Sequence, residues 1–185
     1  SLDRVLRGEV PQCNCNDSDG RDYQPKATYT AMSSPEDKQQ DAFLATDCIA
    51  TEKLVSGEYL TFIDGDDWFE PDCLEYFVSL MELNDCQMAM SDQVMMKSRP
   101  QQIKDDKIQI LTNEQAICSI LYVEVPVAAW NKMYRTELVK THNLTFAISS
   151  FGEGLYFSSQ AAQYCHRVAV GHRKVYGYRM DNVNS

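Results

Sequence analysis

A short apolar segment that ends in a cluster of carboxylates constrains the fold of this chain more than any other feature. Residues 59–63 are nearly all apolar and rich in residues that favour β-strands. This pattern is typical of a buried strand in a parallel sheet. Asp64, Asp66 and Asp67 follow at once. We therefore expect their carboxylates at the carboxyl edge of an open α/β sheet, where such sheets bind ligands.

The carboxylate cluster predicts a metal site. Carboxylates a few ångströms apart repel each other by about 1 to 4 kcal/mol per pair, and a bridging cation relieves that repulsion. Ligands that are all oxygen favour Mg²⁺ or Mn²⁺, which usually complete their coordination with water and a substrate's phosphates. The alternative is a polar turn in which Asp66 and Asp67 only favour the N-terminus of the next helix. The abrupt change from an apolar strand to charge favours the metal site.

Composition and charge limit the classes of function. The 185 residues are 44% hydrophobic and 24% charged, which is typical of one soluble globular domain. The net charge of −10 argues against nucleic acid as a partner. Residues 131–185 contain seven Lys/Arg against three Asp/Glu, so residues 1–130 carry a net charge of −14. This asymmetry suits an anionic substrate or a phospholipid surface, although a solvated surface explains it equally well.

Targeting and cysteine signals favour a cytoplasmic protein. No apolar run approaches the roughly 20 residues of a membrane span, and the N-terminal residues lack the apolar core of a signal peptide. The seven cysteines show neither zinc spacing nor the pattern of a disulfide framework. We expect a cytoplasmic location, with peripheral association at the inner face of the membrane as the alternative.

Strand and helix patterns alternate along the chain, which predicts an α/β fold. Pro71 begins a helix whose buried face contains Leu74, Phe77, Val78 and Met81. Residues 87–91 form the next strand and bring Asp92 to the same sheet edge. Thr112 and Gln115 predict a capping box. The other elements expected are a strand at 11–15, helices at 42–55, 116–122, 136–141 and from 151–154 through Tyr164, and one closing strand over 168–178.

Four motifs in the same order resemble those of the family-2 glycosyltransferases of bacterial capsule, lipopolysaccharide and adhesin glycosylation. Residues 57–68 resemble the family's strand and DxD motif, and residues 130–135 resemble its W-N-K-L-Y-R segment. Residues 146–157 resemble its F…G-E-D…F helix start, and residues 175–179 resemble its closing Y-x-Y-R. The likeness covers about residues 42–182.

The resemblance implies a GT-A-like, Rossmann-like fold with a mixed, mainly parallel sheet flanked by helices. It also implies inverting, metal-assisted transfer of a sugar from a nucleotide-diphosphate sugar, with a UDP-sugar as the expected donor. The acceptor would be a hydroxyl of a glycan, a lipid-linked saccharide or a protein. Within the single domain 1–185, residues 1–56 would be a degraded nucleotide-binding part, 57–92 the DxD strand–helix–strand, and 93–185 the acceptor-side part.

The resemblance also assigns roles to residues by position. Asp64 would hold the ribose or the metal, and Asp66 would bind Mg²⁺ or Mn²⁺, which takes up charge as the glycosidic bond breaks. An inverting reaction needs a carboxylate base, but the family's base falls on Gly154, so Glu153 is the catalytic candidate. The other candidates are, for the nucleotide sugar, Asp17, Asp19 and Asp67, and, on the acceptor side, Trp130, Asn131, Lys132 and Arg179.

Simpler explanations exist for three of these candidates. Glu153 could only favour a helix N-terminus, Trp130 could belong to the core, and Arg179 could pair with a carboxylate instead of a phosphate.

The chain also departs from the family pattern. The family's first strand has no counterpart, the second is polar and ends in residues 16–20, and the family's Arg-Asn pair is not recognisable in residues 45–56. Another segment, or a second copy in a homo-oligomer, would then supply the missing strand.

Two other functions compete with sugar transfer. One is a glycosyltransferase-like module that binds without turnover, which the departures favour. The other is a haloacid-dehalogenase-like phosphatase with Asp64 as nucleophile and Asp66 as acid. Trp68, at the position where that family has Thr or Val, disfavours the phosphatase.

Overall fold

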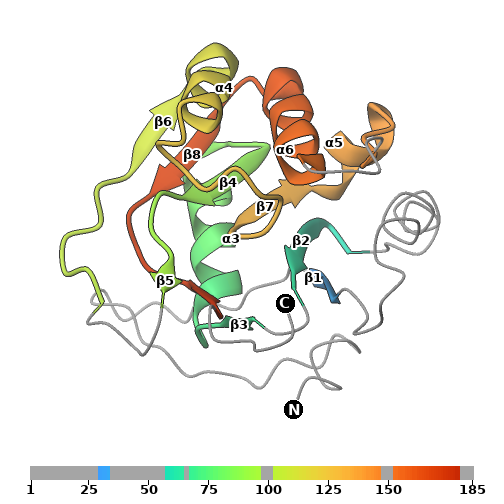
Figure 1. The fold of residues 1–185 in the computed structure, drawn as a ribbon. Helices are drawn as coiled ribbons and strands as arrows, with labels where there is room; N and C mark the ends of the chain where they lie inside the picture. The colour runs from blue at the N-terminus through green and yellow to red at the C-terminus, as the bar shows by residue number, and fades with distance from the viewer. Residues whose placement is uncertain (1–28, 34–56, 65–66, 97–101, 147–151, 180–185) are drawn as a thin grey trace.

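The computed structural model describes residues 29–33, 57–64, 67–96, 102–146 and 152–179 (Figure 1). Its strands are β1 (Tyr29–Ser33), β2 (Tyr59–Ile63), β3 (Trp68–Phe69), β4 (Met88–Ser91), β5 (Met95–Met96), β6 (Gln109–Leu111), β7 (Lys132–Arg135), β8 (Val168–Gly171) and β9 (Tyr176–Tyr178). The helices are α3 (Cys73–Asn84), α4 (Asn113–Leu121), α5 (Thr136–Thr141) and α6 (Glu153–Tyr164). The strands form a six-stranded sheet in the order β1-β2-β7-β4-β8-β6 and a three-stranded sheet in the order β3-β9-β5.

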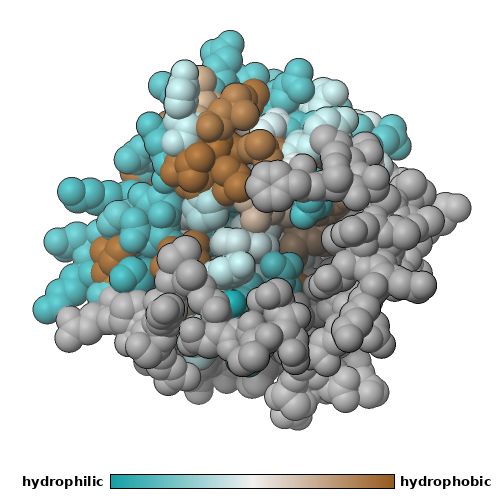
Figure 2. Space-filling view, in the orientation of Figure 1, coloured by the Kyte–Doolittle hydropathy of each residue, from teal (hydrophilic) through white to brown (hydrophobic). Residues whose placement is uncertain are grey.

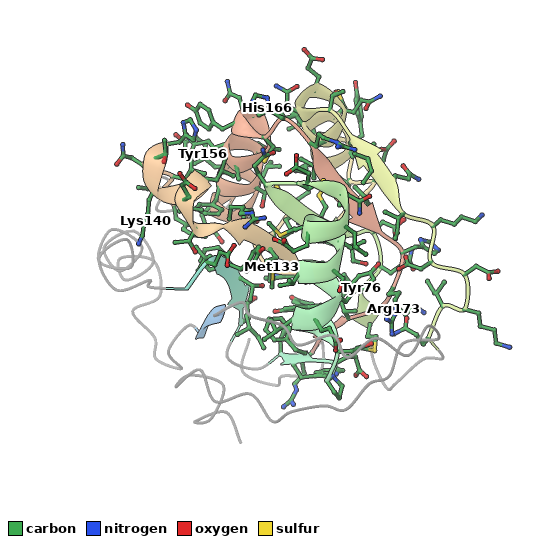
Figure 3. The ribbon with its side chains drawn as sticks, turned by 180° about the vertical axis from the view of Figure 1, so that it is seen from behind. Tyr76, Met133, Lys140, Tyr156, His166 and Arg173 are labelled. Atoms are coloured by element: carbon green, nitrogen blue, oxygen red, sulfur yellow. The ribbon has the colours of Figure 1, made fainter. Side chains whose placement is uncertain are left out.

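The six-stranded sheet is covered by helices on both faces. Alternate strand residues, such as Leu60 and Tyr134, pack in one core with residues of α4 and α6. The residues between them, such as Tyr59 and Met133, pack in a second core against α3. Figure 3, seen from behind, shows Met133 beneath α3. Because both faces are buried, β2, β4 and β8 are almost entirely apolar instead of alternating with polar residues.

Strand direction determines which residues meet at the edge of the sheet. β1 and β2 are parallel, β4 and β8 are parallel, and β7 is antiparallel to both β2 and β4. β6 is antiparallel to β8, so four strands run one way and two the other. This confirms the predicted mixed, mainly parallel sheet. The carboxyl ends of β2, β4 and β8 and the beginning of β7 therefore lie at one edge.

Several local predictions are confirmed, and one side-chain placement needs correction. The strand at 59–63 and the helix at 136–141 have the predicted bounds. Thr112 and Gln115 form the predicted capping box at the start of α4. On α3, the buried face contains Tyr76 and Leu80, whereas Leu74, predicted to be buried, is only partly buried.

The single closing strand predicted over 168–178 is wrong, because the chain forms two strands in different sheets. β8 ends at Gly171, and β9 pairs with β3 and β5. Gly171 passes so close to α3 that a Cβ there would lie 1.8 Å from the Tyr76 hydroxyl oxygen. The segment between the strands is held by the Asp106 carboxylate, which accepts a 2.7 Å hydrogen bond from the His172 backbone N–H.

β1 is a strand that the sequence did not predict. It pairs in parallel with β2, with Tyr29 opposite Tyr59, and so extends the sheet beyond the strand that precedes the carboxylates. The strand expected at 11–15 and the helix expected at 42–55 lie outside the described residues. The predicted division at residues 56 and 92 therefore stays a prediction.

The sheet edge opposite the carboxylates is closed by an ion-pair cluster. Arg135, at the end of β7, lies 2.6 Å from both Glu58 and Glu82, and its guanidinium lies 4.8 Å from the centroid of the Tyr59 ring. The Tyr59 hydroxyl donates to Glu82. The arginine of the W-N-K-M-Y-R segment therefore has a structural role at the far edge.

Large apolar side chains are exposed where α4 ends. Leu121, Tyr122 and Val123 are 56%, 78% and 69% exposed, and Figure 2 shows hydrophobic residues gathered near α4 on this face. No helix among the described residues is both long enough and apolar enough to cross a bilayer. Peripheral association with a membrane stays a prediction.

Candidate functional site

The turn after β2 is held in place by β9. Its ends are joined by a 3.1 Å hydrogen bond from the Asp67 backbone N–H to the Asp64 carbonyl. The Asp67 carboxylate accepts hydrogen bonds from the Tyr176 hydroxyl at 2.6 Å and from the Arg179 backbone N–H at 2.8 Å. The Asp64 backbone N–H donates to the Tyr176 hydroxyl oxygen at 3.2 Å. Thus Asp67, predicted to bind the nucleotide sugar, has contacts that fix the shape of this turn.

The two sides of β9 have different packing. On one side, the Trp68 indole covers Gly177, where a Cβ would lie 2.0 Å from Trp68 Cε2. Tyr176 and Tyr178 stack on Trp130, with ring centroids 4.7 and 5.4 Å apart and interplanar angles of 12° and 22°. Trp130 is partly exposed, so this aromatic stack lies at the surface beside the Asp64–Asp67 turn.

Asn131 lies inside the protein, not at its surface. It is fully buried and in the left-handed region, with φ of +58°. Its Nδ2 donates to the Ser91 and Gln93 carbonyls at 3.0 and 3.1 Å, on either side of Asp92. Its buried Oδ1 has no hydrogen-bond partner among the described residues. Asn131 therefore fixes the backbone around Asp92, and its predicted contact with an acceptor stays a prediction.

Lys132 is also completely buried, and its ammonium group holds the loop before β7. Nζ donates to the Ala128 carbonyl at 2.7 Å and to the Pro126 carbonyl. Burial lowers the pKa of Lys132 to about 7, because removal from water disfavours the charged form. As with Asn131, the structure shows this predicted acceptor residue in contact with backbone.

Position 154 has no space for a side chain. Gly154 lies in the first turn of α6 against the loop that Lys132 holds, and a Cβ there would lie 2.9 Å from Ala128 Cα and from Ala129 N. Ser158, one turn later, donates to the Ala128 carbonyl at 3.2 Å. The position that the family resemblance assigns to the base is thus filled by the backbone of a neighbouring loop.

Glu153 is the acidic residue of the first turn of α6. It is partly exposed, and a carboxylate is favourably placed beside the partial positive charge of a helix N-terminus. Gly152 precedes it with a φ of +107°, a conformation that glycine adopts without steric strain. Glu153 is therefore the first residue of α6, directly after a backbone conformation that favours glycine.

The strand ends β4 and β8 bring together a pair of residues that the sequence did not link. Asp92 lies at the predicted edge, and both of its carboxylate oxygens are 2.8 Å from His172 Nδ1. No sequence pattern indicates this contact, but the parallel register of Ser91 with Gly171 places the next residues side by side. Such a carboxylate orients an imidazole ring.

A cavity of about 460 Å³ lies on the α3 side of the molecule. Tyr76 and Arg173, both labelled in Figure 3, contribute to its lining. The Tyr76 hydroxyl donates to Asp106 at 3.0 Å, and the Arg173 guanidinium lies 5.2 Å from the centroid of the Tyr76 ring. Of the described residues of the Asp64–Asp67 turn, neither Asp64 nor Asp67 contributes to this lining.

Some of the predicted site residues lie outside the described part of the chain: Asp17, Asp19 and Asp66. Within the described residues no group of three or more His, Cys, Asp or Glu side chains is arranged to hold a metal ion. Of the predicted pair, Asp64 is among the described residues and Asp66 is not. Its role as a metal site therefore stays a prediction.

Comparisons with known proteins agree with the predicted family and fold. The family model described as glycosyl transferase family 2 matches residues 44–143, more than half of the chain. The chain is 28% identical over 131 residues to the putative glycosyltransferase EpsH of Bacillus subtilis (strain 168), over 67% of this chain and 38% of EpsH. It thus spans well under half of that relative.

Solved structures of S. aureus TarS are similar in fold. TarS 1–349 in complex with UDP-GlcNAc has a TM-score of 0.55 and 20% identity, over 70% of this chain and 37% of TarS 1–349. TarS 1–349 without the ligand has a TM-score of 0.57 and 18% identity, over 73% of this chain and 40% of that chain. At such identity the likeness shows the fold alone, and it confirms the predicted GT-A-like α/β class.

Proposed function

Because the chain belongs to glycosyl transferase family 2, we propose that it transfers a sugar from a nucleotide-diphosphate sugar to an acceptor hydroxyl. One observation carries this proposal: the Asp64–Asp67 turn and the Trp130 stack lie together at one sheet edge, and Tyr176 contacts both. The complex of TarS with UDP-GlcNAc supports a UDP-sugar as the donor. A hydroxyl of a glycan, a lipid-linked saccharide or a protein is the proposed acceptor.

We propose that Asp64 and Asp66 hold Mn²⁺ or Mg²⁺ at the turn. The donor set fits a hard divalent ion, since it consists of carboxylate oxygens. When bound, such an ion supplies positive charge to the departing diphosphate. The contacts of Asp67 with Tyr176 and Arg179 hold the end of the turn at β9 without a ligand.

Glu153 is the proposed base of an inverting reaction. A base must come within hydrogen-bond distance of the acceptor hydroxyl on the face of the sugar opposite the leaving group. Glu153 is at the partly exposed start of α6, and Gly154 is packed on the loop that leads to Trp130. The aromatic face of Trp130 suits the apolar face of an acceptor sugar.

A second candidate function is a module that binds a nucleotide sugar or glycan without turnover. The observation that favours it is Gly154, where the backbone of Ala128 and Ala129 leaves no space for the family's carboxylate. This module and the enzyme share the donor site and differ in whether Glu153 acts as a base. A test must therefore separate donor binding from sugar transfer.

Titration with UDP and Mn²⁺, followed by calorimetry, tests the donor site. We expect Asp66→Ala to abolish Mn²⁺-dependent UDP binding, and Asp105→Ala, which changes an exposed acid elsewhere, to leave it unchanged. Binding that survives Asp66→Ala would refute the metal assignment.

Turnover of UDP-sugars in the presence of Mn²⁺ then distinguishes the two functions. Hydrolysis or transfer by the wild type that Glu153→Gln reduces, with UDP affinity unchanged, supports the enzyme. Tight binding without any turnover would instead support the module.

A further inference from the structure

Tyr176 contacts both halves of the candidate site. Its hydroxyl meets the Asp64–Asp67 turn, and its ring meets Trp130. The turn and Trp130 come from segments far apart in the sequence, and Tyr176, which contacts both, belongs to β9. The side chain of a single residue therefore links the proposed metal turn to the proposed acceptor side.

The ring of Tyr176 is held firmly. It is fully buried, it packs edge-on against Phe69 with centroids 5.6 Å apart and an interplanar angle of 71°, and it is almost parallel to Trp130. The backbone pairing of Phe69 with Tyr176 between β3 and β9 fixes the position from which the side chain extends. A displacement of this ring would therefore displace the indole of Trp130.

The hydroxyl of Tyr176 is used as both donor and acceptor. It donates its one hydrogen to Asp67 Oδ2 at 2.6 Å and accepts the Asp64 backbone N–H at 3.2 Å. Burial and the hydrogen bond to Asp67 raise the pKa of Tyr176, so that the hydroxyl keeps the proton that it donates. A tyrosine hydroxyl can make both bonds at once.

We propose that Tyr176 is a positioning residue that couples the Asp64–Asp67 turn to Trp130, so that occupancy of the turn by a metal diphosphate changes the environment of the indole. The inference rests on the proposed donor site and adds a connection between donor and acceptor sides. Coupling of this kind is reciprocal, so a ligand that moves Trp130 also alters affinity at the turn.

Tyr176→Phe tests the coupling, because phenylalanine keeps the ring and removes only the hydroxyl. A hydrogen bond to a charged group contributes enough that its loss should weaken Mn²⁺–UDP binding by about tenfold or more. Mn²⁺–UDP should change the tryptophan fluorescence of the wild type, and the contribution of Trp130 is the part of this change that Trp130→Phe lacks. Tyr176→Phe should lack that part as well. Circular dichroism and the thermal midpoint show whether the variant is folded.

Tyr178→Phe is the matched control. Tyr178 stacks on the same indole, but no hydrogen bond of its hydroxyl is present among the described residues. We expect Mn²⁺–UDP affinity within about twofold of the wild type and an unchanged Trp130 response. The proposed coupling through the Tyr176 hydroxyl is wrong if Tyr176→Phe keeps the Mn²⁺–UDP affinity and the Trp130 response of the wild type. It is also wrong if Tyr178→Phe loses as much affinity and response as Tyr176→Phe.

Hydrogen exchange measured without ligand separates failure of the coupling from failure of the donor site. Tyr176→Phe removes the acceptor of the Asp64 N–H, so that amide should exchange faster and the emission of Trp130 should shift, with Tyr178→Phe as the control again. If neither changes, the coupling is refuted whether or not UDP binds. If both change but the wild type does not bind Mn²⁺–UDP, the coupling stands and the proposed donor site fails.

Discussion

Replacement of Lys132 by methionine tests how the loop before the Trp130 stack is held. Lys132 is fully buried, and Nζ donates to the Pro126 and Ala128 carbonyls. A neutral amine has two N–H groups, which satisfies both carbonyls, whereas an ammonium group has a third that must also find an acceptor. Burial accordingly lowers the pKa of Lys132 from 10.5 to about 7. Methionine preserves the length of the chain and removes the titration.

The sign and size of the effect follow from proton linkage. The unfolded chain keeps Lys132 protonated up to about pH 10.5, whereas the folded protein releases that proton near pH 7. Between these values the unfolded state binds one more proton, so stability rises by about 1.4 kcal/mol per pH unit. The contribution is lost as the pH falls towards 7. From pH 6 to pH 9.5 it amounts to about 3 kcal/mol.

Urea unfolding of both proteins at several pH values between 6 and 9.5, followed by tryptophan fluorescence, measures this contribution. Buried thiols also affect stability at the upper end of this range, because burial raises the pKa of Cys73, Cys86 and Cys165. They keep their protons in the folded protein, while the unfolded chain begins to release them. They are common to both proteins and cancel in the difference. We therefore expect the stability of the wild type relative to Lys132→Met to rise with pH.

Lys107→Met, which changes an exposed lysine, is the control, and its stability relative to the wild type should stay constant with pH. Lys132→Arg is a second comparison, since arginine keeps its proton throughout the range. It should lack the rise and lose stability at every pH. A difference between wild type and Lys132→Met that is flat from pH 6 to pH 9.5 would refute the buried, titrating amine.

Two glycines and one helix cap give further predictions, each measured by urea unfolding. Gly154→Ala should lower the free energy of unfolding by about 1 to 3 kcal/mol and should shift Trp130 emission, because the new Cβ pushes on Ala128. Gly152→Ala should cost about 1 to 3 kcal/mol through backbone strain but leave that emission unchanged, because a Cβ at Gly152 would meet no neighbouring atom of the described residues within 4 Å. An equal shift in both would contradict the close contact at Gly154. Thr112→Ala should cost about 1 kcal/mol by removing the cap of α4, whereas Thr112→Ser should restore it; equal stability of all three would show that the cap contributes nothing.

Local sequence patterns were sufficient to predict much of the fold. The apolar residues 59–63 lie between polar segments, and the Thr112–Gln115 box depends only on two residues three positions apart. The separation of β8 from β9 depends instead on the indole of Trp68, which covers Gly177 from a strand far away in the sequence. No periodicity within residues 168–178 contains that information.

The candidate site was harder to predict because polar residues can serve a ligand or the backbone. Asn131 and Lys132 were predicted to face an acceptor, but both are buried on backbone carbonyls. The Asn131 side chain bonds to carbonyls around Asp92, and the Lys132 side chain bonds to carbonyls of the loop before β7. The role of Tyr176 depends on contacts more than 100 residues apart in the chain and could not be read from its motif.

The close packing of Gly154 on Ala128 also constrains how this lineage can change. Glycine and aspartate codons can differ by one base, so the ancestral carboxylate implied by the family resemblance is genetically near. An aspartate at this position would nevertheless meet the backbone at 2.9 Å and disrupt a well-packed region. Reversion of Gly154 to aspartate would first require a mutation that moves the loop containing Ala128 away from α6. The order in which the mutations arise therefore decides whether this reversion can occur.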